Sequence, residues 1–410
     1  MTARRICLIT PGHLSSTPRL VKEADALHAA GYSVRVVAAD HFAAVRPLDA
    51  SILARAPWRC DRVTLGLRPA YLARRLVQKF ARGRLSAARL PSPRLALWAH
   101  QPLAFRLAAA AAREPADLYL GHCLAGLAAA GLAAAKTGAR LGFDAEDFHR
   151  AEVSDDPQPE LVALENHWLP RCRHLTAASP LIAEAYAAAC GVPVPSVLLN
   201  VFPLAEAPAR RPLPPARPSL YWFSQTIGPG RGLEPLVAVL ARLTAPVDLH
   251  LRGLPSPGFP DALTRQSRAA GFRGELVFHP LANPSEMVPL AAAHTLGLSL
   301  EQPVPRNRDL CLTNKIFTYL LAGTPVLLTP TRAQRRLAED LGEAALCLDF
   351  SDPATAALEL DVWLATPARQ ATASTHAAEL GRTRYNWERE SPVFISSVQA
   401  ALSARPGTFE

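Results

Sequence analysis

The chain has 410 residues, more than one hydrophobic core usually supports, so we expect two domains. Its apolar residues, 49% of the total, occur in runs too short for a membrane span of about 20 residues or for a signal peptide. The formal net charge is +9, and the seven cysteines show no CxxC spacing, which favours a reducing cytoplasm over a disulfide framework.

Short apolar strands alternate with helical patterns in the first half of the chain. Arg5–Thr10 is the first expected strand, and Pro18 suits the first turn of the helix that follows. Further strands are expected at Ser33–Ala38, Asp117–Leu120, Ala139–Phe143, His174–Ala178 and Ser196–Leu199. This alternation predicts an α/β fold with mainly parallel sheets.

Residues 62–113 stand apart, because they hold eleven basic residues and no Asp or Glu. Apolar residues such as Leu76 and Phe80 lie between the cations, so the segment is basic and amphipathic. Such a segment suits an anionic membrane surface, although a solvated basic face would produce the same pattern, and the sequence leaves both open. We expect no nucleic-acid partner, because no nucleic-acid module or groove-reading motif accompanies the charge.

Six prolines within residues 203–218 mark a stiff linker, and the strand–helix alternation restarts beyond it. The expected strands there are Leu220–Ser224, Val247–Arg252, Glu275–His279, Thr295–Leu300, Pro325–Leu328 and Ala344–Leu348. We therefore predict an N-terminal Rossmann-like domain (1–202), the linker (203–218), a C-terminal Rossmann-like domain (219–384) and a final helical segment (385–410). Neither half contains GxGxxG, so the dinucleotide fingerprint is missing from the sequence.

The strongest functional pattern lies in the second half. Glu301 ends an apolar strand, and Asn314-Lys315 opens a helix that stops at Gly323. The carboxylate can accept hydrogen bonds from sugar hydroxyls, while the Lys and the free N–H groups of the helix start can hold phosphate oxygens. Upstream, Arg231 follows a strand in a Gly-rich loop, where backbone and guanidinium can both approach a ligand. The alternative interpretations are a solvated loop acid, an ordinary helix cation and a solvated turn arginine.

Residues 222–234 and 301–326 resemble the donor-site segments of family 4-like GT-B glycosyltransferases (glycosyl transferases group 1). The resemblance covers nearly the whole chain. It implies two Rossmann-like domains that face a central cleft, with a C-terminal helix that crosses back to the first domain.

The resemblance also implies roles for particular residues. Its catalytic candidates are Arg231, Lys315 and Glu301, with both cations on the donor diphosphate. Its donor-binding candidates are Gly12, Gly230, Asn314 and Thr318. Thr318 occupies the position at which the family has a ribose-binding Glu, so the chain departs from the family pattern there.

The first domain supplies acceptor-side candidates, which are His13, His122, Asp144 and Glu146. His13 lies with Gly12 in the loop after the first strand, which in the family approaches the donor. Asp144 and Glu146 belong to a segment that resembles the family's Asp-x-His-Glu, with Glu146 in place of the His. Carboxylates at strand ends can orient or deprotonate an acceptor hydroxyl, and helix capping or solvent exposure is the alternative.

The resemblance implies a retaining hexosyl- or related glycosyltransferase that moves a sugar from a nucleotide-diphosphate donor to a glycan or lipid-linked acceptor. We expect no cofactor and no metal, because two cations are present and no metal-ligand cluster is visible in the sequence. We expect a cytoplasmic protein with peripheral contact to the inner face of the cell membrane through residues 62–113. Two alternatives stay open: a nucleotide-sugar epimerase on the same fold, and a catalytically weakened GT-B protein acting as a membrane-surface partner.

Overall fold

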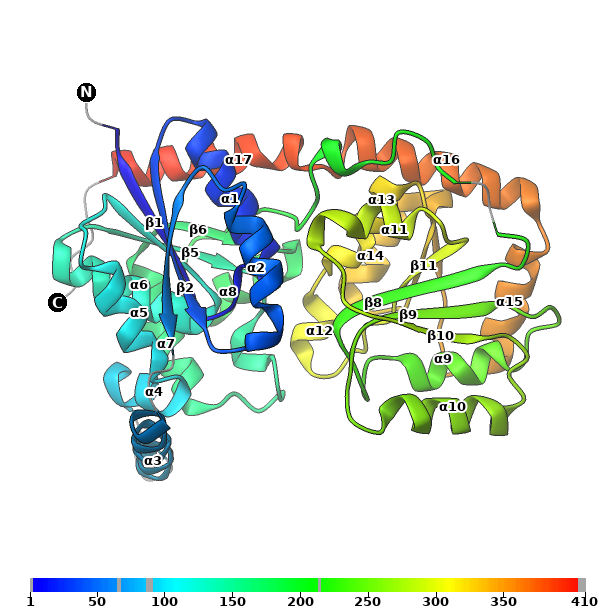
Figure 1. Ribbon diagram of the computed structural model, residues 1–410, viewed down its shortest axis with the longest axis horizontal. Helices are drawn as coiled ribbons and strands as arrows, with labels where there is room; N and C mark the ends of the chain where they lie inside the picture. The colour runs from blue at the N-terminus through cyan, green and yellow to red at the C-terminus, as the bar shows by residue number, and fades with distance from the viewer. Residues whose placement is uncertain (1–2, 65–67, 86–90, 213–214, 405–410) are drawn as a thin grey trace. The chain divides into compact units, whose positions relative to one another are not determined.

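The computed structural model describes residues 3–64, 68–85, 91–212 and 215–404, and it divides into two compact units. The first unit comprises residues 1–198 and 391–410, and the second comprises residues 199–390. Each unit is built on a parallel sheet of its own (Figure 1). The Pro-rich segment 203–218 belongs to the second unit.

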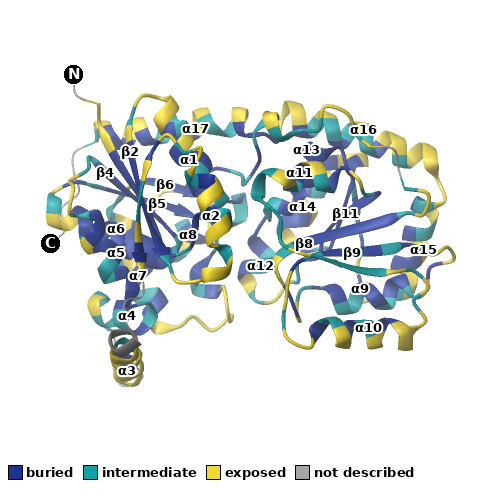
Figure 2. Ribbon diagram, viewed as in Figure 1, coloured by how far each residue is buried: buried dark blue, intermediate teal, exposed yellow. Residues whose placement is uncertain are grey.

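A seven-stranded parallel sheet with the order β3-β2-β1-β4-β5-β6-β7 forms the first unit. Its strands are β1 (Arg5–Thr10), β2 (Ser33–Asp40), β3 (Arg59–Thr64), β4 (Leu118–His122), β5 (Arg140–Ala145), β6 (Cys172–Ala177) and β7 (Ser196–Val197). The helices between them are α1 (Pro18–Ala29), α2 (Arg46–Leu53), α3 (Arg68–Leu85), α4 (Pro93–His100), α5 (Leu103–Ala111), α6 (Cys123–Thr137), α7 (Pro159–Trp168) and α8 (Pro180–Cys190). The central strands β1 and β4 are buried on both faces (Figure 2), as parallel strands covered by helices require.

Helix α6 packs directly on the end of β4 because Gly121 has no side chain. A Cβ at Gly121 would lie 2.5 Å from the backbone of Gly126 and of Leu127, closer than real Cβ contacts come. His122, the last residue of β4, is also the N-cap of α6.

The basic segment 62–113 does not form one element. It contains the end of β3, then α3, α4 and α5, while residues 65–67 and 86–90 lie outside the described part. β3 is an edge strand that the sequence did not predict, because Arg59, Asp61 and Arg62 conceal its apolar alternation. Among the described residues, no helix has the length and apolar character needed to cross a bilayer.

A six-stranded parallel sheet with the order β10-β9-β8-β11-β12-β13 forms the second unit. Its strands are β8 (Ser219–Ile227), β9 (Asp248–Pro255), β10 (Leu276–His279), β11 (Leu296–Ser299), β12 (Val326–Leu328) and β13 (Ala345–Cys347). Its helices are α9 (Leu233–Leu240), α10 (Phe259–Ala270), α11 (Met287–Ala291), α12 (Arg306–Leu310), α13 (Asn314–Ala322), α14 (Arg332–Leu341), α15 (Pro353–Leu364) and α16 (Pro367–Thr383). α9 and α10 cover one face of this sheet and α11 and α13 the other (Figure 1).

The last helix, α17 (Trp387–Ser403), starts in the second unit, and its residues from Ser391 onward belong to the first. In the first unit it is fastened to β6, because Ser397 Oγ lies 2.9 Å from His174 Nδ1 and Phe394 packs edge-on against the same imidazole. The predicted fold class, two Rossmann-like α/β units with a C-terminal helix that returns to the first, is confirmed.

Candidate active site

The two sheets each have a topological switch point, where strand order reverses and ligands of open α/β sheets usually bind. In the second unit the switch lies between β8 and β11, which are neighbours in the sheet although they are distant in sequence. The loop after β8 carries Gly230 and Arg231, and Glu301 follows β11. With Asn314 and Lys315 at the start of α13, these five residues are called the β8–β11 group below.

The loop after β8 lies against the chain that leaves β11. Gly232 has a φ of +78°, and a Cβ there would come within 2.5 Å of the Leu300 carbonyl oxygen, so only glycine fits. Arg308 Nη1 donates a hydrogen bond of 2.7 Å to the Gly230 carbonyl and ties α12 to this loop. The contacts bring Gly230 and Arg231 to the same sheet edge as Glu301.

Lys315 and Glu301 form a long ion pair in this group. Lys315 Nζ lies 3.5 Å from Glu301 Oε1 and 5.8 Å from the centre of the Trp222 ring. Their side chains are 10% and 12% exposed, so both reach the surface from a mostly apolar setting. The pair is close enough to orient the two groups and long enough to be replaced by tighter contacts to a ligand.

The start of α13 offers further donors. Lys315 is the second residue of this helix, and the Thr313 side chain at the N-cap makes no capping hydrogen bond. Free N–H groups and the positive end of a helix dipole attract anions, whereas a cation in the first turn is unfavourable unless an anion binds there. The geometry therefore suits phosphate oxygens.

Arg231 is half-buried and has no hydrogen-bond or ion-pair partner among the described residues. Together with Lys315 it gives the group two cations against the single carboxylate of Glu301. An excess of positive charge at a sheet switch point is the arrangement that binds a diphosphate.

Two neighbouring side chains do not present oxygens to this group. Thr318 is fully buried, and its hydroxyl donates a hydrogen bond of 3.0 Å to the Asn314 carbonyl within α13. Asp309 accepts hydrogen bonds from the backbone and the side chain of Arg332. Thr318 stands where the GT-B family that the sequence resembles has a ribose-binding Glu. A ribose bound here would therefore be held by other groups.

In the first unit the switch point lies between β1 and β4, and His13 lies in the loop after β1. His13 is buried, its Nδ1 lies 2.7 Å from Asp49 Oδ2, and its Nε2 accepts hydrogen bonds from the backbone N–H groups of His41 and Phe42. Both ring nitrogens are thus occupied, so His13 holds the loop together. Its neighbour Gly12 donates its N–H to Thr10 Oγ1, and the hydroxyls of Ser16 and Thr17 leave little room for a side chain there.

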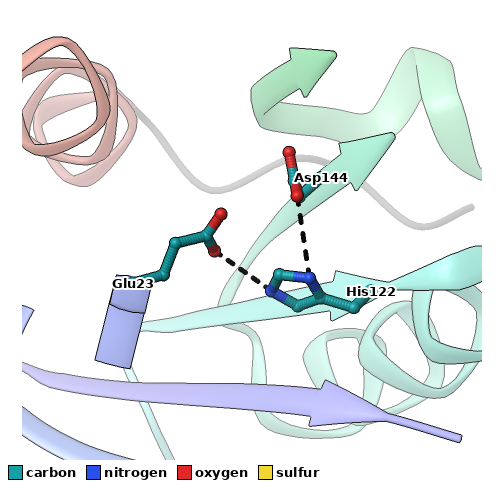
Figure 3. Close-up of side chains that lie close together, drawn as sticks. All are labelled: Glu23, His122 and Asp144. Atoms are coloured by element: carbon teal, nitrogen blue, oxygen red, sulfur yellow. Dashed lines mark ion pairs between the residues drawn. The ribbon is translucent and has the colours of Figure 1, made fainter. Parts of the chain in front are cut away.

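Four charged side chains gather beneath this switch point: Arg19 and Glu23 from α1, His122 from β4 and Asp144 from β5. They are called the buried cluster, since none is more than 1% exposed. Arg19 binds both oxygens of Asp144, and His122 Nε2 lies 3.0 Å from Glu23 Oε2. Figure 3 shows His122 between the two carboxylates, with its Nδ1 3.7 Å from Asp144 Oδ2.

The protonation of the buried cluster follows from its contacts. Burial favours a neutral imidazole, but the carboxylates of Glu23, Glu146 and Asp144 outweigh it and raise the pKa of His122 to about 10. Burial and the nearby Asp144 raise the pKa of Glu23 to about 7. Burial also opposes ionisation of Asp144, but Arg19 and His122 hold the pKa of that carboxyl below its ordinary value. His122 is therefore an imidazolium at neutral pH.

Glu146 is the acid that connects this cluster with solvent. Its side chain is 20% exposed, and its Oε1 lies 3.5 Å from His122 Nδ1. The imidazolium orients the Glu146 carboxylate at the carboxyl end of β5, where it can accept a hydrogen bond from a substrate hydroxyl. The predicted residues His122, Asp144 and Glu146 are thus brought together, and His13 lies apart from them in its own network.

The buried cluster is also the place where described side chains could hold a metal ion. Ligand atoms of Glu23, His122 and Asp144 lie within 4.8 Å of one another. Arg19 already contacts both carboxylates, at 3.5 Å from Glu23, so the negative charge there is balanced by a protein cation.

Sequence reasoning missed Glu23 and Arg308. Glu23 lies on the apolar face of α1, three residues after Leu20 and one before Ala24, and an acid in that position signals a buried partner. The sequence does not point to Arg308, because this side chain donates its hydrogen bond to a backbone carbonyl, which every residue has.

Comparison with known proteins rests on structure alone, since neither a protein-family model nor a curated protein sequence matches this chain. Anabaena HepE, solved with UDP and glucose, matches with a TM-score of 0.72 at 15% identity, over 97% of this chain and 100% of that one. A glycosyltransferase from Rickettsia africae matches with a TM-score of 0.71 at 11% identity, over 98% and 100% of the two chains.

A third similar structure belongs to another class of enzyme. A putative UDP-N-acetylglucosamine 2-epimerase from Listeria monocytogenes matches with a TM-score of 0.56 at 14% identity, over 98% of this chain and 97% of that one. Identities this low establish architecture, and the two parallel sheets with a returning C-terminal helix agree with it. The chain therefore has the GT-B fold of nucleotide-sugar glycosyltransferases, as its sequence resemblance predicted.

Proposed function

We propose that the protein is a glycosyltransferase that moves a sugar from a nucleotide-diphosphate donor to a glycan or lipid-linked acceptor. The observation that carries this proposal is the β8–β11 group at a sheet switch point, in which Lys315 and Arg231, the latter without a partner among the described residues, exceed the charge of Glu301. Similar structures solved with UDP and with UDP-glucose give independent support for the donor class.

The second unit would hold the donor. Lys315, Arg231 and the N–H groups at the start of α13 would bind the diphosphate and stabilise the charge that grows on it as the sugar leaves. Glu301, released from its 3.5 Å contact with Lys315, would accept hydrogen bonds from hydroxyls of the sugar or ribose. Because these groups are in place before binding, little reorganisation is needed during the reaction.

We propose that transfer proceeds with retention and without a protein nucleophile. Asp144 and His122 are fully buried and paired, so neither is a free attacking group, and Glu301 would be occupied by hydroxyls of the bound donor. His122 orients Glu146, and we assign to this carboxylate the hydrogen bond with the acceptor hydroxyl.

The experiment that tests the proposal begins with ligand-induced stabilisation. Thermal unfolding is measured with UDP-, GDP-, ADP- and TDP-sugars, since a ligand that binds only the folded protein raises the melting temperature. The best donor is then incubated with and without acceptor pools of glycans and lipid-linked sugars, and the products are identified. Transfer that depends on acceptor supports the proposal, and an altered nucleotide-sugar formed without acceptor supports an epimerase instead. A protein that binds no nucleotide-sugar would contradict both.

We further propose that α3 brings the first unit to an anionic membrane. Among the side chains of this helix that the structure describes, four large apolar ones are exposed, and together they form the apolar stripe: Leu72, Leu76, Val77 and Phe80. The exposed cations Arg75 and Lys79 flank the stripe, while Ala81 and Leu85 pack on α4. An exposed apolar stripe bordered by cations is the pattern of interfacial helices.

Liposome sedimentation tests this second proposal. Wild-type protein should bind anionic liposomes at low salt, and Leu76→Gln/Phe80→Gln should bind less because the inserted apolar area is lost. Leu358→Gln is the matched control, since Leu358 is an equally exposed leucine on α15 of the second unit. If the double variant binds liposomes as well as the wild type does, the apolar stripe does not contact the membrane.

A further inference from the structure

A small cavity lies at the base of α3, on the side of this helix that faces the body of the first unit. Its volume is about 160 Å³, and the polar side chains that line it are those of His41, Arg74, Arg75, Gln78 and Gln101. His41 directly follows β2, so the cavity opens at the carboxyl edge of the first sheet. The acceptor-side candidates of the first unit lie along this same edge.

The charged side chains among the described residues that line this cavity are cations. Within the described part of the chain, Arg74 Nη2 is enclosed by protein and has no hydrogen-bond partner, and no Asp or Glu is among the lining residues. Loss of solvent, with a smaller effect of the neighbouring Arg106, lowers the pKa of Arg74. Arg75, a second lining residue, adds another positive charge. An enclosed donor without an acceptor is costly, so such an arrangement in a native protein indicates a missing anionic partner.

We propose that this cavity binds a phosphate group carried by the acceptor. A phosphate is small enough for the volume, and its oxygens match the planar fork of a guanidinium. The proposal rests on the glycosyltransferase function and deepens it, because it gives the acceptor a chemical class: a phosphate monoester or diester.

The position of the cavity supports a role in acceptor binding. The His41 ring lies 4.9 Å from the ring of His13, whose loop follows β1 at the switch point. His41 therefore lies between the cavity and that loop. The rest of an acceptor whose phosphate is bound by Arg74 would lie close to the loop after β1. The same helix carries the apolar stripe, so the phosphate could belong to a soluble sugar phosphate or to a lipid.

The first experiment measures binding of glycerol 3-phosphate to the full protein, without donor, by calorimetry and thermal unfolding. We expect Arg74→Gln to weaken binding by about 10- to 100-fold, the effect of losing a charge-assisted hydrogen bond. Arg84→Gln is the matched control, since Arg84 is an exposed cation of the same helix that does not line the cavity. Lys315→Ala should also retain this binding, which separates the cavity from the proposed diphosphate site.

A second measurement distinguishes ligand binding from a structural role. Without phosphate, Arg74→Gln should melt at the wild-type temperature or above, because it removes an enclosed and unpaired cation. A lower melting temperature would show that Arg74 supports the fold and would overturn the proposal. Equal phosphate affinity in the wild type and Arg74→Gln would overturn it as well.

The source of the phosphate is read from a comparison of probes. Arg74-dependent binding of glycerol 3-phosphate indicates a soluble phosphorylated acceptor, whereas binding only to vesicles that contain phosphatidic acid indicates a lipid phosphate. Binding of neither probe by the wild type overturns the proposal. Nucleotide-sugar binding, measured on the same samples, reports on the proposed function separately, since its groups lie in the second unit.

Discussion

The two switch points of this protein handle charge in opposite ways. In the first unit, Arg19, Glu23, His122 and Asp144 are at most 1% exposed, and their charges neutralise one another inside the protein. In the second unit, Lys315 and Glu301 are about one-tenth exposed and 3.5 Å apart, and Arg231 has no partner among the described residues.

The two sites differ because the charged groups of the buried cluster are removed from water, whereas those of the β8–β11 group still reach it. Charges that leave water entirely need internal partners with good geometry, because an uncompensated buried charge costs several kcal/mol. Charges that stay near the surface can remain in excess until a ligand supplies the opposite sign. The buried cluster therefore positions Glu146 and stabilises its sheet, whereas the β8–β11 group is poised for an anion.

The strongest test of this comparison is to remove Arg19, the buried arginine of the first unit. Arg19→Met removes the strongest partner of Asp144 and the second cation beside Glu23, and we expect the first unit to lose about 3–5 kcal/mol of stability. Urea unfolding, followed by hydrogen exchange in β4 and β5, measures this loss. Arg384→Gln is the control, because its ion pair with Asp340 is half-exposed and should contribute at most about 1 kcal/mol. Similar losses in the two variants would refute the contrast.

The corresponding change in the second unit should affect activity and leave the fold intact. Lys315→Ala and Arg231→Ala should each reduce turnover by about 100- to 1,000-fold, or roughly 2.7–4 kcal/mol of barrier, through lost stabilisation of the leaving diphosphate. Arg242→Ala is the control, because Arg242 is an exposed arginine just after α9 that donates a hydrogen bond to the Ala238 carbonyl of that helix. Melting temperatures near that of the wild type should accompany the loss, and near-normal turnover in either variant would remove that residue from the proposed site.

Two buried histidines of the first sheet should respond to pH in opposite directions. Burial lowers the pKa of His174 to about 4, so the unfolded chain takes up its proton first as the pH falls. The stability that His174 contributes is complete above pH 6.5 and is lost between pH 6.5 and about 4, by up to ~3 kcal/mol. The pKa of His122 is raised to about 10, so its contribution is complete below pH 6.5 and is lost as the pH rises through 10.

Urea unfolding across this range, on the wild type and on His174→Gln, checks the acid limb. Gln preserves a polar partner for Ser397 and cannot be protonated, so the variant should lose less stability between pH 6.5 and 4. Identical acid profiles would show that protonation of His174 is not what lowers stability between pH 6.5 and 4.

The sequence predicted those parts of the fold that depend on local pattern. Strands such as β1 and β11 are short apolar runs in parallel sheets, and their predicted ranges lie within two residues of the observed ones. Lys315 and Glu301 were predicted together because both flank the same strand-to-helix connection. β3 was missed because an edge strand carries charged residues along its length.

Features that depend on distant pairing could not be predicted. The helical periodicity of α1 indicates that Glu23 needs a buried partner, but it does not identify that partner as His122 of β4. His13 was an acceptor-side candidate because of its place after β1, and its contacts with Asp49 and two backbone N–H groups could not be read from the sequence. Catalytic roles for Lys315, Arg231 and Glu301 remain predictions, and the variants above test those of Lys315 and Arg231.

The smallest expected effect is that of removing divalent metal. Lys315, Arg231 and the α13 N-terminus can supply the positive charge that a metal would otherwise bring to a diphosphate, so transfer should persist in excess EDTA. Melting in EDTA gives an independent readout, since a metal held by Glu23, His122 and Asp144 would stabilise the first unit even if it took no part in transfer. Loss of turnover in EDTA that Mg²⁺ or Mn²⁺ restores would contradict the expectation. It would also overturn the comparison, because the β8–β11 group would then lack the positive charge that distinguishes it from the buried cluster.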